Sequence, residues 1–206
     1  MQVKSLLSRM VTPDQAKRFL TAVGYDYSHW TRPVMYRECL KLLEPLGPSS
    51  LDVLEISAGR FWRNAGFASF SEANFPAFDI CADVLDRRFD LVIADQVFEH
   101  LPWPYRAARN VHAMLRPGGH FLVTTPFMIR VHDVPIDCTR WTETGIRYFL
   151  AECGFPLDQS VSGSWGNRAC VKANFRRWAR RGWFGSLRNE REFPVAVWCL
   201  ARKGAE

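Results

Sequence analysis

Two short apolar segments near the middle of the chain constrain its fold most strongly. Residues 91–94 form an uninterrupted apolar run, which is typical of a buried strand of a parallel sheet. A second strand is predicted at residues 120–124, directly after a turn made by Pro117, Gly118 and Gly119. Apolar residues at helical spacing predict a helix over residues 105–114, between the two strands. This order of elements predicts an α/β fold.

Polar side chains follow the first of these strands directly: Asp95, Gln96, Glu99 and His100. Open parallel sheets bind ligands at the carboxyl ends of their strands, in the crevice where the strand order reverses. These residues therefore predict a binding site rather than a part of the core.

The rest of the chain continues the alternation of strands and helices. A breaker cluster at residues 45–50 precedes an apolar strand at residues 51–56. Two helices are predicted between Thr12 and Leu46, broken around residues 24–33, and another helix is predicted at residues 143–153. Further strands are predicted at residues 67–72, 78–82, 157–162 and 195–200. This pattern favours a doubly wound sheet.

Length and composition indicate one globular domain. The chain has 206 residues, 48% of them hydrophobic, and no run long enough to span a bilayer. The first ten residues lack the apolar core of a secretory signal, so we expect a cytoplasmic protein. The six cysteines are scattered, without a C-x-x-C pair, and this argues against a disulfide framework or zinc. We expect reduced thiols and no metal.

The formal net charge of +6 is concentrated near the C-terminus. Such a patch could attract an anionic substrate, although a run of charges is also typical of a solvated helix face. The sequence has no RRM, KH or zinc-finger pattern, so nucleic acid is not the expected partner. The basic residues of this Trp-rich segment are Arg168, Lys172, Arg176, Arg177, Arg180, Arg181, Arg188 and Arg191.

The segment F-D-L-V at residues 89–92, the E-H-L at residues 99–101 and the L-R-P-G-G at residues 115–119 resemble the class I S-adenosylmethionine-dependent methyltransferases, in particular their small type 11-like subset. The resemblance implies a three-layer αβα fold with a seven-stranded Rossmann-like sheet of order 3-2-1-4-5-7-6. Its last strand, at residues 194–202, would be antiparallel and inserted beside the fifth. One methyltransferase domain over residues 1–206 would comprise an N-terminal helical cap (1–48), a cofactor-binding core (51–155) and C-terminal strands with the basic, Trp-rich insertion (156–206).

The resemblance also implies which residues bind the cofactor. Glu55 would meet the methionine amino group, and the small residues Ser57, Ala58 and Gly59 would let the cofactor pass close to the backbone. The family usually has G-x-G-x-G here, and Arg60 stands where its last glycine is common. Arg60 would pair with the cofactor carboxylate, but such a degenerate loop also fits a weakened or lost site.

Further along the chain, Glu72 would hold the ribose hydroxyls, with Asp79 as its rival. Asp83 matches the acidic position that accepts from the adenine amino group, with Val84 packing on the ring, although an aspartate here could equally cap a helix. Asp95 and Gln96 would face the methionine part of the cofactor or the substrate. His100 would support the cofactor or act as a base.

The loop after the fifth strand, residues 125–145, resembles a P-F-x(4)-H-x-x-P-x-D-x-x-R-(Y/W)-T segment of some small methyltransferases. His132 is the candidate general base, oriented by Asp137 or Asp133. The substrate-binding candidates are Phe127, Arg140 and Trp141. Alternatively, Arg140 and Asp137 pair only to fix the loop. The Trp-rich segment at residues 164–183 could form an aromatic lid with the N-terminal helices at residues 11–30, or simply pack in the core.

The sequence thus predicts an enzyme that transfers a methyl group from S-adenosylmethionine to a hydroxyl or amine of a small molecule, releasing S-adenosylhomocysteine. We expect a monomer or homodimer without membrane partners. Three alternatives remain open. They are a non-catalytic methyltransferase-like subunit, an RNA methyltransferase that uses the basic segment, and a dinucleotide-dependent oxidoreductase, which lacks support because residues 55–60 do not form G-x-G-x-x-G.

Overall fold

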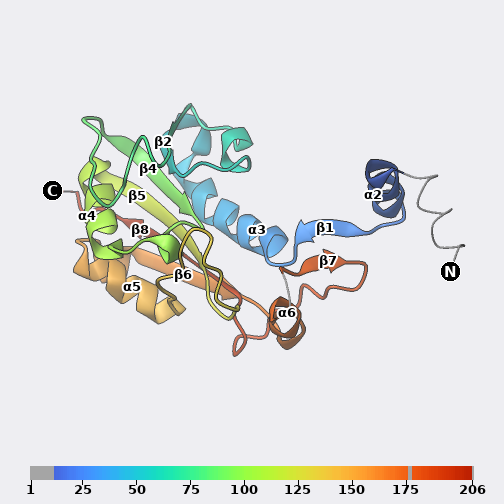
Figure 1. Cartoon of the computed structure of the whole chain (residues 1–206). Helices are drawn as coiled ribbons and strands as arrows, with labels where there is room; N and C mark the ends of the chain where they lie inside the picture. The colour runs from blue at the N-terminus through green and yellow to red at the C-terminus, as the bar shows by residue number, and fades with distance from the viewer. Residues whose placement is uncertain (1–11, 176–177, 206) are drawn as a thin grey trace, which may run out of the picture.

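A central sheet organises the molecule in the computed structural model, which describes residues 12–175 and 178–205 (Figure 1). Its strands stand side by side in the order β3-β2-β4-β5-β8-β6, and β8 runs antiparallel to both of its neighbours. This arrangement confirms the predicted α/β fold and the antiparallel strand beside the long central one. The six strands are β2 (Asp52–Ile56), β3 (Ser69–Ala73), β4 (Phe89–Asp95), β5 (Leu115–Pro126), β6 (Ser160–Trp165) and β8 (Ala196–Arg202).

The strand predicted at residues 78–82, the third along the chain, is wrong, because no strand forms there. The backbone N–H groups of Ala82 and Asp83 both donate to the carbonyl of Asp79, and the Asp79 carboxylate accepts from Cys81 N at 2.9 Å. An aspartate that captures nearby backbone groups in this way favours a turn over a sheet ladder. The apolar pattern of the segment reflects burial instead, because Phe78 and Ile80 are buried in the core.

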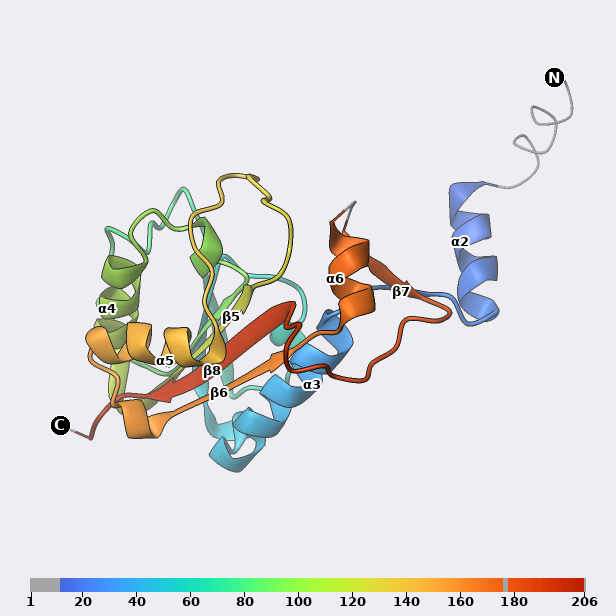
Figure 2. The same ribbon diagram turned by 90° about the horizontal axis from the view of Figure 1, so that it is seen from below.

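Helices cover both faces of the sheet and complete the three layers (Figure 2). Alternate residues of β4 show how the faces divide: Val92 and Ala94 pack with α4 (Pro104–Met114) and α5 (Glu143–Glu152). Leu91 and Ile93 belong to the opposite face. That face is covered by α3 (Arg32–Leu43), whose buried stripe recurs every four residues at Met35, Cys39 and Leu43, and by α6 (Arg168–Asn174).

The N-terminal region departs from the simple cap that the sequence predicts. Helix α2 (Pro13–Ala22) begins at Thr12, whose side chain forms a capping box with Gln15. Between α2 and α3 lies β1 (Asp26–His29), which pairs antiparallel with β7 (Arg180–Gly182). This ribbon carries α2 away from the sheet in both views (Figures 1 and 2). Residues 1–11 of the predicted cap lie outside the described residues.

Short 3-10 turns complete the chain and shape the carboxyl edge of the sheet. The crossover from β2 to β3 contains only the turn η3 (Trp62–Asn64), while η4 (Phe98–His100) follows β4. Within the described ranges, no helix is long and apolar enough to cross a membrane. The other turns are η1 (Glu44–Leu46), η2 (Pro48–Ser50) and η5 (Leu157–Gln159).

Candidate functional site

A cavity of about 520 Å³ lies where the strands β2, β3 and β4 end. Its volume falls within the range of about 300–1,000 Å³ that is typical of small-molecule sites. Most of the lining is apolar or aromatic, with a few polar groups such as Asp79, Gln96 and His100. The side chains come from residues 56–57, 75, 78–81, 96–97, 100–103 and 134–136. The cavity therefore occupies the edge of the sheet at which the sequence places a ligand.

Glu55, near the end of β2, is a buried carboxylate with one open oxygen. Its Oε1 accepts a hydrogen bond from Gly59 N at 3.0 Å, whereas Oε2 is buried and has no partner in the described structure. Burial is the main cause that raises the pKa of Glu55 to about 7. Glu55 directly precedes Ile56 and Ser57 along the chain, and these two residues line the cavity. An unpaired carboxylate in this place is suited to receive a cationic donor such as an ammonium group.

The loop after β2 is held tightly at the edge of the sheet. Ser57 adopts a left-handed conformation with φ of 54°, a strained backbone for a residue other than glycine. Its N–H donates to the carbonyl of Ala73 at 2.9 Å, and Ala58 N donates to the Asn74 side chain at 2.7 Å. Sequence analysis missed Asn74, although its position directly after β3 was the available signal. Arg60 is exposed.

The residue after β4 repeats this backbone strain. Gln96 has a φ of 60°, and its N–H donates to the carbonyl of Thr124 at 3.0 Å, so that its side chain lines the cavity. Left-handed residues therefore stand at the ends of two adjacent parallel strands. Strain of this kind concentrates at functional sites, where the surrounding structure holds it in place.

The Asp95 carboxylate is engaged in hydrogen bonds with other side chains of the protein. Its carboxylate accepts from Arg32 at 3.0 and 3.1 Å, from Tyr36 Oη at 2.8 Å and from Thr124 Oγ1 at 2.6 Å. The side chain is only 7% exposed. Asp95 therefore ties α3 to the sheet. Sequence analysis missed this role because Arg32 and Tyr36 are about 60 residues away along the chain.

The acidic candidates after β3 lie in different environments. Glu72 forms an ion pair with Arg63, and Asp83 accepts from Asp79 N at 2.7 Å. Asp79 lines the cavity, whereas neither Asp83 nor its exposed neighbour Val84 belongs to the lining. The structure thus brings the predicted rival, Asp79, to the cavity and places Asp83 behind it as a turn residue.

The loop after β5 is fastened onto η4 and closes one side of the cavity. Cys138 N donates to the Glu99 carbonyl at 2.7 Å, and Thr139 Oγ1 donates to the Phe98 carbonyl at 3.2 Å. Asp137 accepts from the backbone N–H of His132 at 2.8 Å and pairs with Arg140. Asp137 therefore fixes the loop and does not orient the His132 ring.

The two aromatic substrate candidates of this region pack against the core. Trp141 stacks on Phe149, with ring centroids 4.9 Å apart, and Phe127 is partly buried beside the same cluster. Phe127 N also donates to the carbonyl of Val195 at 2.9 Å. Their contacts place both rings beneath the loop rather than in the lining of the cavity.

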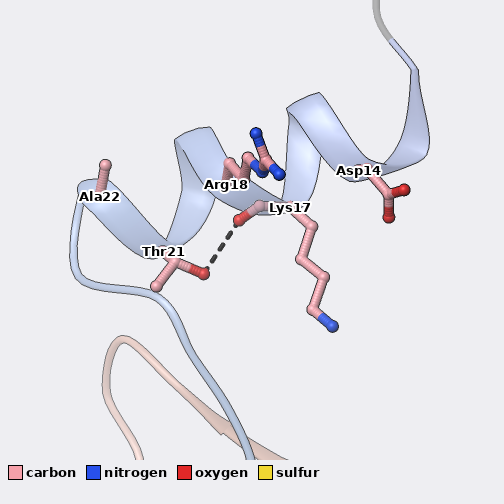
Figure 3. Close-up of a pocket in the computed structure, with 5 residues that line it drawn as sticks. All are labelled: Asp14, Lys17, Arg18, Thr21 and Ala22. Carbon is pink, nitrogen blue, oxygen red and sulfur yellow. Dashed lines mark hydrogen bonds between the residues drawn. The ribbon is translucent and has the colours of Figure 1, made fainter.

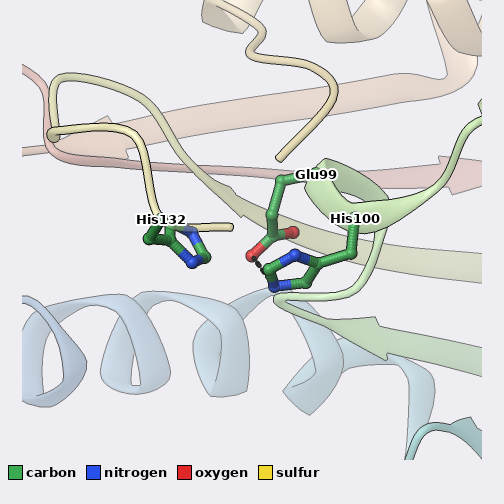
Figure 4. A group of neighbouring side chains, drawn as sticks. All are labelled: Glu99, His100 and His132. Carbon is green, nitrogen blue, oxygen red and sulfur yellow. Dashed lines mark ion pairs between the residues drawn. The ribbon is translucent and has the colours of Figure 1, made fainter. Parts of the chain in front are cut away.

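Glu99, His100 and His132 form a compact cluster beside the cavity, with the three side chains turned toward one another (Figure 4). One ligand atom from each residue lies within 4.8 Å of the others. Burial raises the pKa of Glu99 to about 8, and burial followed by the charge of His100 lowers the pKa of His132. His132 is therefore neutral at pH 7. Trp178 packs against its ring at a centroid distance of 4.9 Å.

The remaining candidate surfaces lie apart from this edge. A hollow on α2 is lined by residues of that helix alone, and Thr21 Oγ1 donates there to the carbonyl of Lys17 at 2.9 Å (Figure 3). Arg168 pairs with Glu190, and Arg181 with Asp26, so part of the basic segment is used for internal contacts. Arg176 and Arg177 lie outside the described residues. Of the predicted lid, Trp178 reaches the site, and α2 does not cover it.

Comparisons with known proteins agree with this geometry. Residues 6–156 match the family model described as "Methyltransferase domain", and the chain therefore belongs to that family. With its α/β sheet and the crevice at the carboxyl edge, the chain is a class I S-adenosylmethionine-dependent methyltransferase. A search of curated proteins gave no match.

Several solved structures share the fold at low sequence identity. A putative sarcosine dimethylglycine methyltransferase from Galdieria sulphuraria is 14% identical, with a TM-score of 0.56 and coverage of 93% of this chain and 98% of the other. The 1,6-didemethyltoxoflavin-N1-methyltransferase of Burkholderia thailandensis is 15% identical, with a TM-score of 0.56 and coverage of 87% of this chain and 80% of the other. An S-adenosylmethionine-dependent methyltransferase from Mesorhizobium loti is 17% identical, with a TM-score of 0.53 and coverage of 79% of this chain and 96% of the other.

S-adenosylmethionine is the cofactor of this class, and the residues at the edge of the sheet fit it. The open, buried oxygen of Glu55 matches a cationic amino group, and the small residues 57–59 leave room beside the backbone. The aromatic and aliphatic lining around Asp79 suits a purine and its ribose.

Proposed function

We propose that this methyltransferase acts on a hydroxyl or amine of a small-molecule acceptor. The observation that carries the proposal is the cavity at the carboxyl edge, which residues 134–136 and Trp103 wall in on the acceptor side. A walled cavity of about 520 Å³ suits a cofactor and a small metabolite better than a polymer, which needs an open groove. The structurally similar methyltransferase from Burkholderia thailandensis, which holds 1,6-didemethyltoxoflavin beside S-adenosylhomocysteine, also supports this class.

In this proposal, different residues at the edge of the sheet bind different parts of the cofactor and the acceptor. Glu55 receives the methionine ammonium group, and because Glu55 is not itself among the lining residues, this requires the loop at residues 57–60 to shift slightly. Asp79 lies on the adenosine side, and Gln96 and His100 face the methyl group and the acceptor. S-adenosylmethionine supplies an activated sulfonium methyl group, so the protein contributes mainly position and exclusion of water.

The basic segment favours a small acceptor over RNA. Arg168 and Arg181 are engaged by carboxylates, and Arg180 donates to the carbonyl of Tyr27 at 2.9 Å while its guanidinium lies over the Tyr27 ring. Cations that hold the β1–β7 ribbon together are less available to phosphates.

Calorimetric titration with S-adenosylhomocysteine tests the binding step without knowledge of the acceptor. We expect micromolar affinity that falls about 10- to 100-fold in Glu55→Gln, because the ammonium group then loses its charged partner. Glu38→Gln makes the same change at a half-buried position of α3 outside the cavity lining and should leave the affinity unaltered. No binding to the folded wild-type protein would overturn the proposed function.

Transfer of a labelled methyl group to fractionated small metabolites and to total RNA tests the acceptor class. We expect label in the small-molecule fraction, at a hydroxyl or amine. Label found only in RNA would contradict the proposal and favour the alternative that uses the basic segment.

A further inference from the structure

We propose that Glu99, His100 and His132 bind a divalent first-row transition cation, and that this cation holds the acceptor oxygen during methyl transfer. The metal site itself stands on the geometry of these side chains. Its role in catalysis rests on the proposed function. The sequence predicts no metal, because it has no cysteine-based pattern and the three ligands come from two distant segments, η4 and the loop after β5.

The spacing of the three side chains suits a metal ion. Ligand atoms no more than 4.8 Å apart have a common centre within about 2.8 Å of each. Each atom would therefore have to move by under about 1 Å to reach the usual metal–ligand distances of about 2.0–2.2 Å. Rotations of side chains are enough for movements of this size.

Two atoms of the cluster lack partners that a cation would supply. Glu99 Oε2 and His132 Nε2 are both buried and make no hydrogen bond in the described structure. Unpaired polar atoms in the interior of a protein are rare and costly, and two in one cluster call for a shared partner. Glu99 is only 1% exposed, so bulk water does not fill this role.

His100 is already oriented as a metal ligand. Its Nδ1 lies within hydrogen-bond distance of the Ile136 carbonyl, which fixes the proton on that nitrogen and leaves the lone pair on Nε2. Nε2 in turn lies 3.8 Å from Glu99 Oε1. Histidine ligands in metal sites almost always donate their second N–H to a carbonyl or carboxylate in this way.

The donor set indicates the kind of cation. Two imidazoles and one carboxylate suit zinc, cobalt, manganese or ferrous iron, whereas calcium and magnesium prefer sites built from oxygen alone. Three protein ligands leave at least one coordination position open, as in catalytic sites. His100 also lines the cavity, so an open position on its side would face the acceptor.

The cation changes the role of His132. An acceptor hydroxyl bound to the cation loses its proton to solvent more easily, because the positive charge stabilises the resulting oxyanion. The oxyanion then forms the new bond to the methyl carbon as the carbon–sulfur bond breaks and its electron pair returns to sulfur. His132, whose lone pair is bound to the cation, is a ligand rather than the general base.

Titration of chelator-treated, tag-free protein with Co²⁺ tests the site directly through the visible absorption of the bound ion. We expect saturation at one ion per chain, with bands typical of mixed nitrogen and oxygen ligation. Glu99→Gln and His132→Gln should each weaken Co²⁺ binding at least about tenfold, because a ligand is lost. His29→Gln serves as the control, since His29 is exposed beside the same Trp178.

The outcomes separate the two proposals. Absence of saturable Co²⁺ binding, or binding equal in all four proteins, overturns the metal site, while S-adenosylhomocysteine binding remains a separate test of the proposed function. We expect Glu99→Gln to keep that affinity and its thermal transition. The wild-type spectrum needs no variant, so misfolding of a variant does not remove the test.

Discussion

Asp95 and Glu99 are two carboxylates four residues apart at the same end of β4, and they differ in how their oxygens are used. The Asp95 carboxylate accepts hydrogen bonds from Arg32, Tyr36 and Thr124. The Glu99 carboxylate is more deeply buried, yet its Oε2 has no partner in the described part of the chain. Burial alone therefore does not distinguish a structural carboxylate from a functional one, whereas the state of its oxygens does.

Glu55 resembles Glu99 in this respect. Each has one buried oxygen without a partner, and burial raises the pKa of Glu55 to about 7 and that of Glu99 to about 8. Asp95 is held by a guanidinium group, while Glu55 and Glu99 lack a bound cation of this kind within the described residues. This difference supports a structural role for Asp95 and supports the proposed ligand-binding roles of the two glutamates.

The largest expected effect is on the free energy of unfolding, which should fall much more on loss of the Asp95 carboxylate than on loss of the Glu99 carboxylate. Asp95→Ala should lower the free energy of unfolding by about 3 kcal/mol, because Arg32 loses the carboxylate that neutralises it. Glu99→Gln should change it by less than about 1 kcal/mol, since Glu99 Oε2 has no hydrogen-bond partner to lose. Urea unfolding of both variants and of Glu38→Ala, a half-buried control on α3, measures these values. Equal losses in the two variants would contradict the comparison.

The sheet could be predicted from the sequence because its signals are local. Apolar runs such as residues 91–94 and the Pro-Gly-Gly turn depend on near neighbours, and the antiparallel β8 followed from the family resemblance. The β1–β7 ribbon could not be predicted, because it pairs Asp26 with Gly182, and β7 is only three residues long. Contacts this distant along the chain leave no periodic pattern.

The second prediction concerns the pH dependence of cofactor binding at Glu55. Because its pKa lies at about 7, the carboxylate is mostly protonated at pH 6 and mostly ionised at pH 8. The ammonium group needs the ionised form, so affinity for S-adenosylhomocysteine should rise about tenfold from pH 6 to pH 8. Glu55→Gln should bind weakly with a flat profile. An affinity that falls with pH, or an equal rise in Glu55→Gln, would exclude Glu55 as the titrating partner.

The location of the candidate site could be predicted from the sequence, but the contacts between its residues could not. The sequence indicated the carboxyl edge correctly because strand ends can be read from the pattern, and the cavity lies there. It gave no means to predict that Arg32 would donate hydrogen bonds to Asp95 or that His132 would lie beside Glu99, since the two residues of each pair come from separate elements. The state of a carboxylate depends on such long-range contacts.

The smallest expected effect is on cofactor affinity, where Asp79 and Asp83 should differ. These two carboxylates extend the comparison of engaged and open oxygens to the proposed adenosine side of the cavity. Asp79 lines the cavity, and only its Oδ1 is engaged, by Cys81 N, within the described structure. Asp83, which the resemblance favoured, holds Asp79 N through its own carboxylate. Asp79→Asn should weaken S-adenosylhomocysteine binding about fivefold, as expected for loss of one charged acceptor at a partly open site.

Asp83→Asn is the matched variant, because an asparagine keeps an oxygen that can accept from Asp79 N. We expect its affinity to stay within about twofold of the wild-type value, since the turn is preserved. Calorimetric titration of both variants at pH 8, where Glu55 is mostly ionised, makes the difference easiest to measure. A larger loss in Asp83→Asn than in Asp79→Asn would reverse the assignment and show that the ligand reaches past the cavity wall.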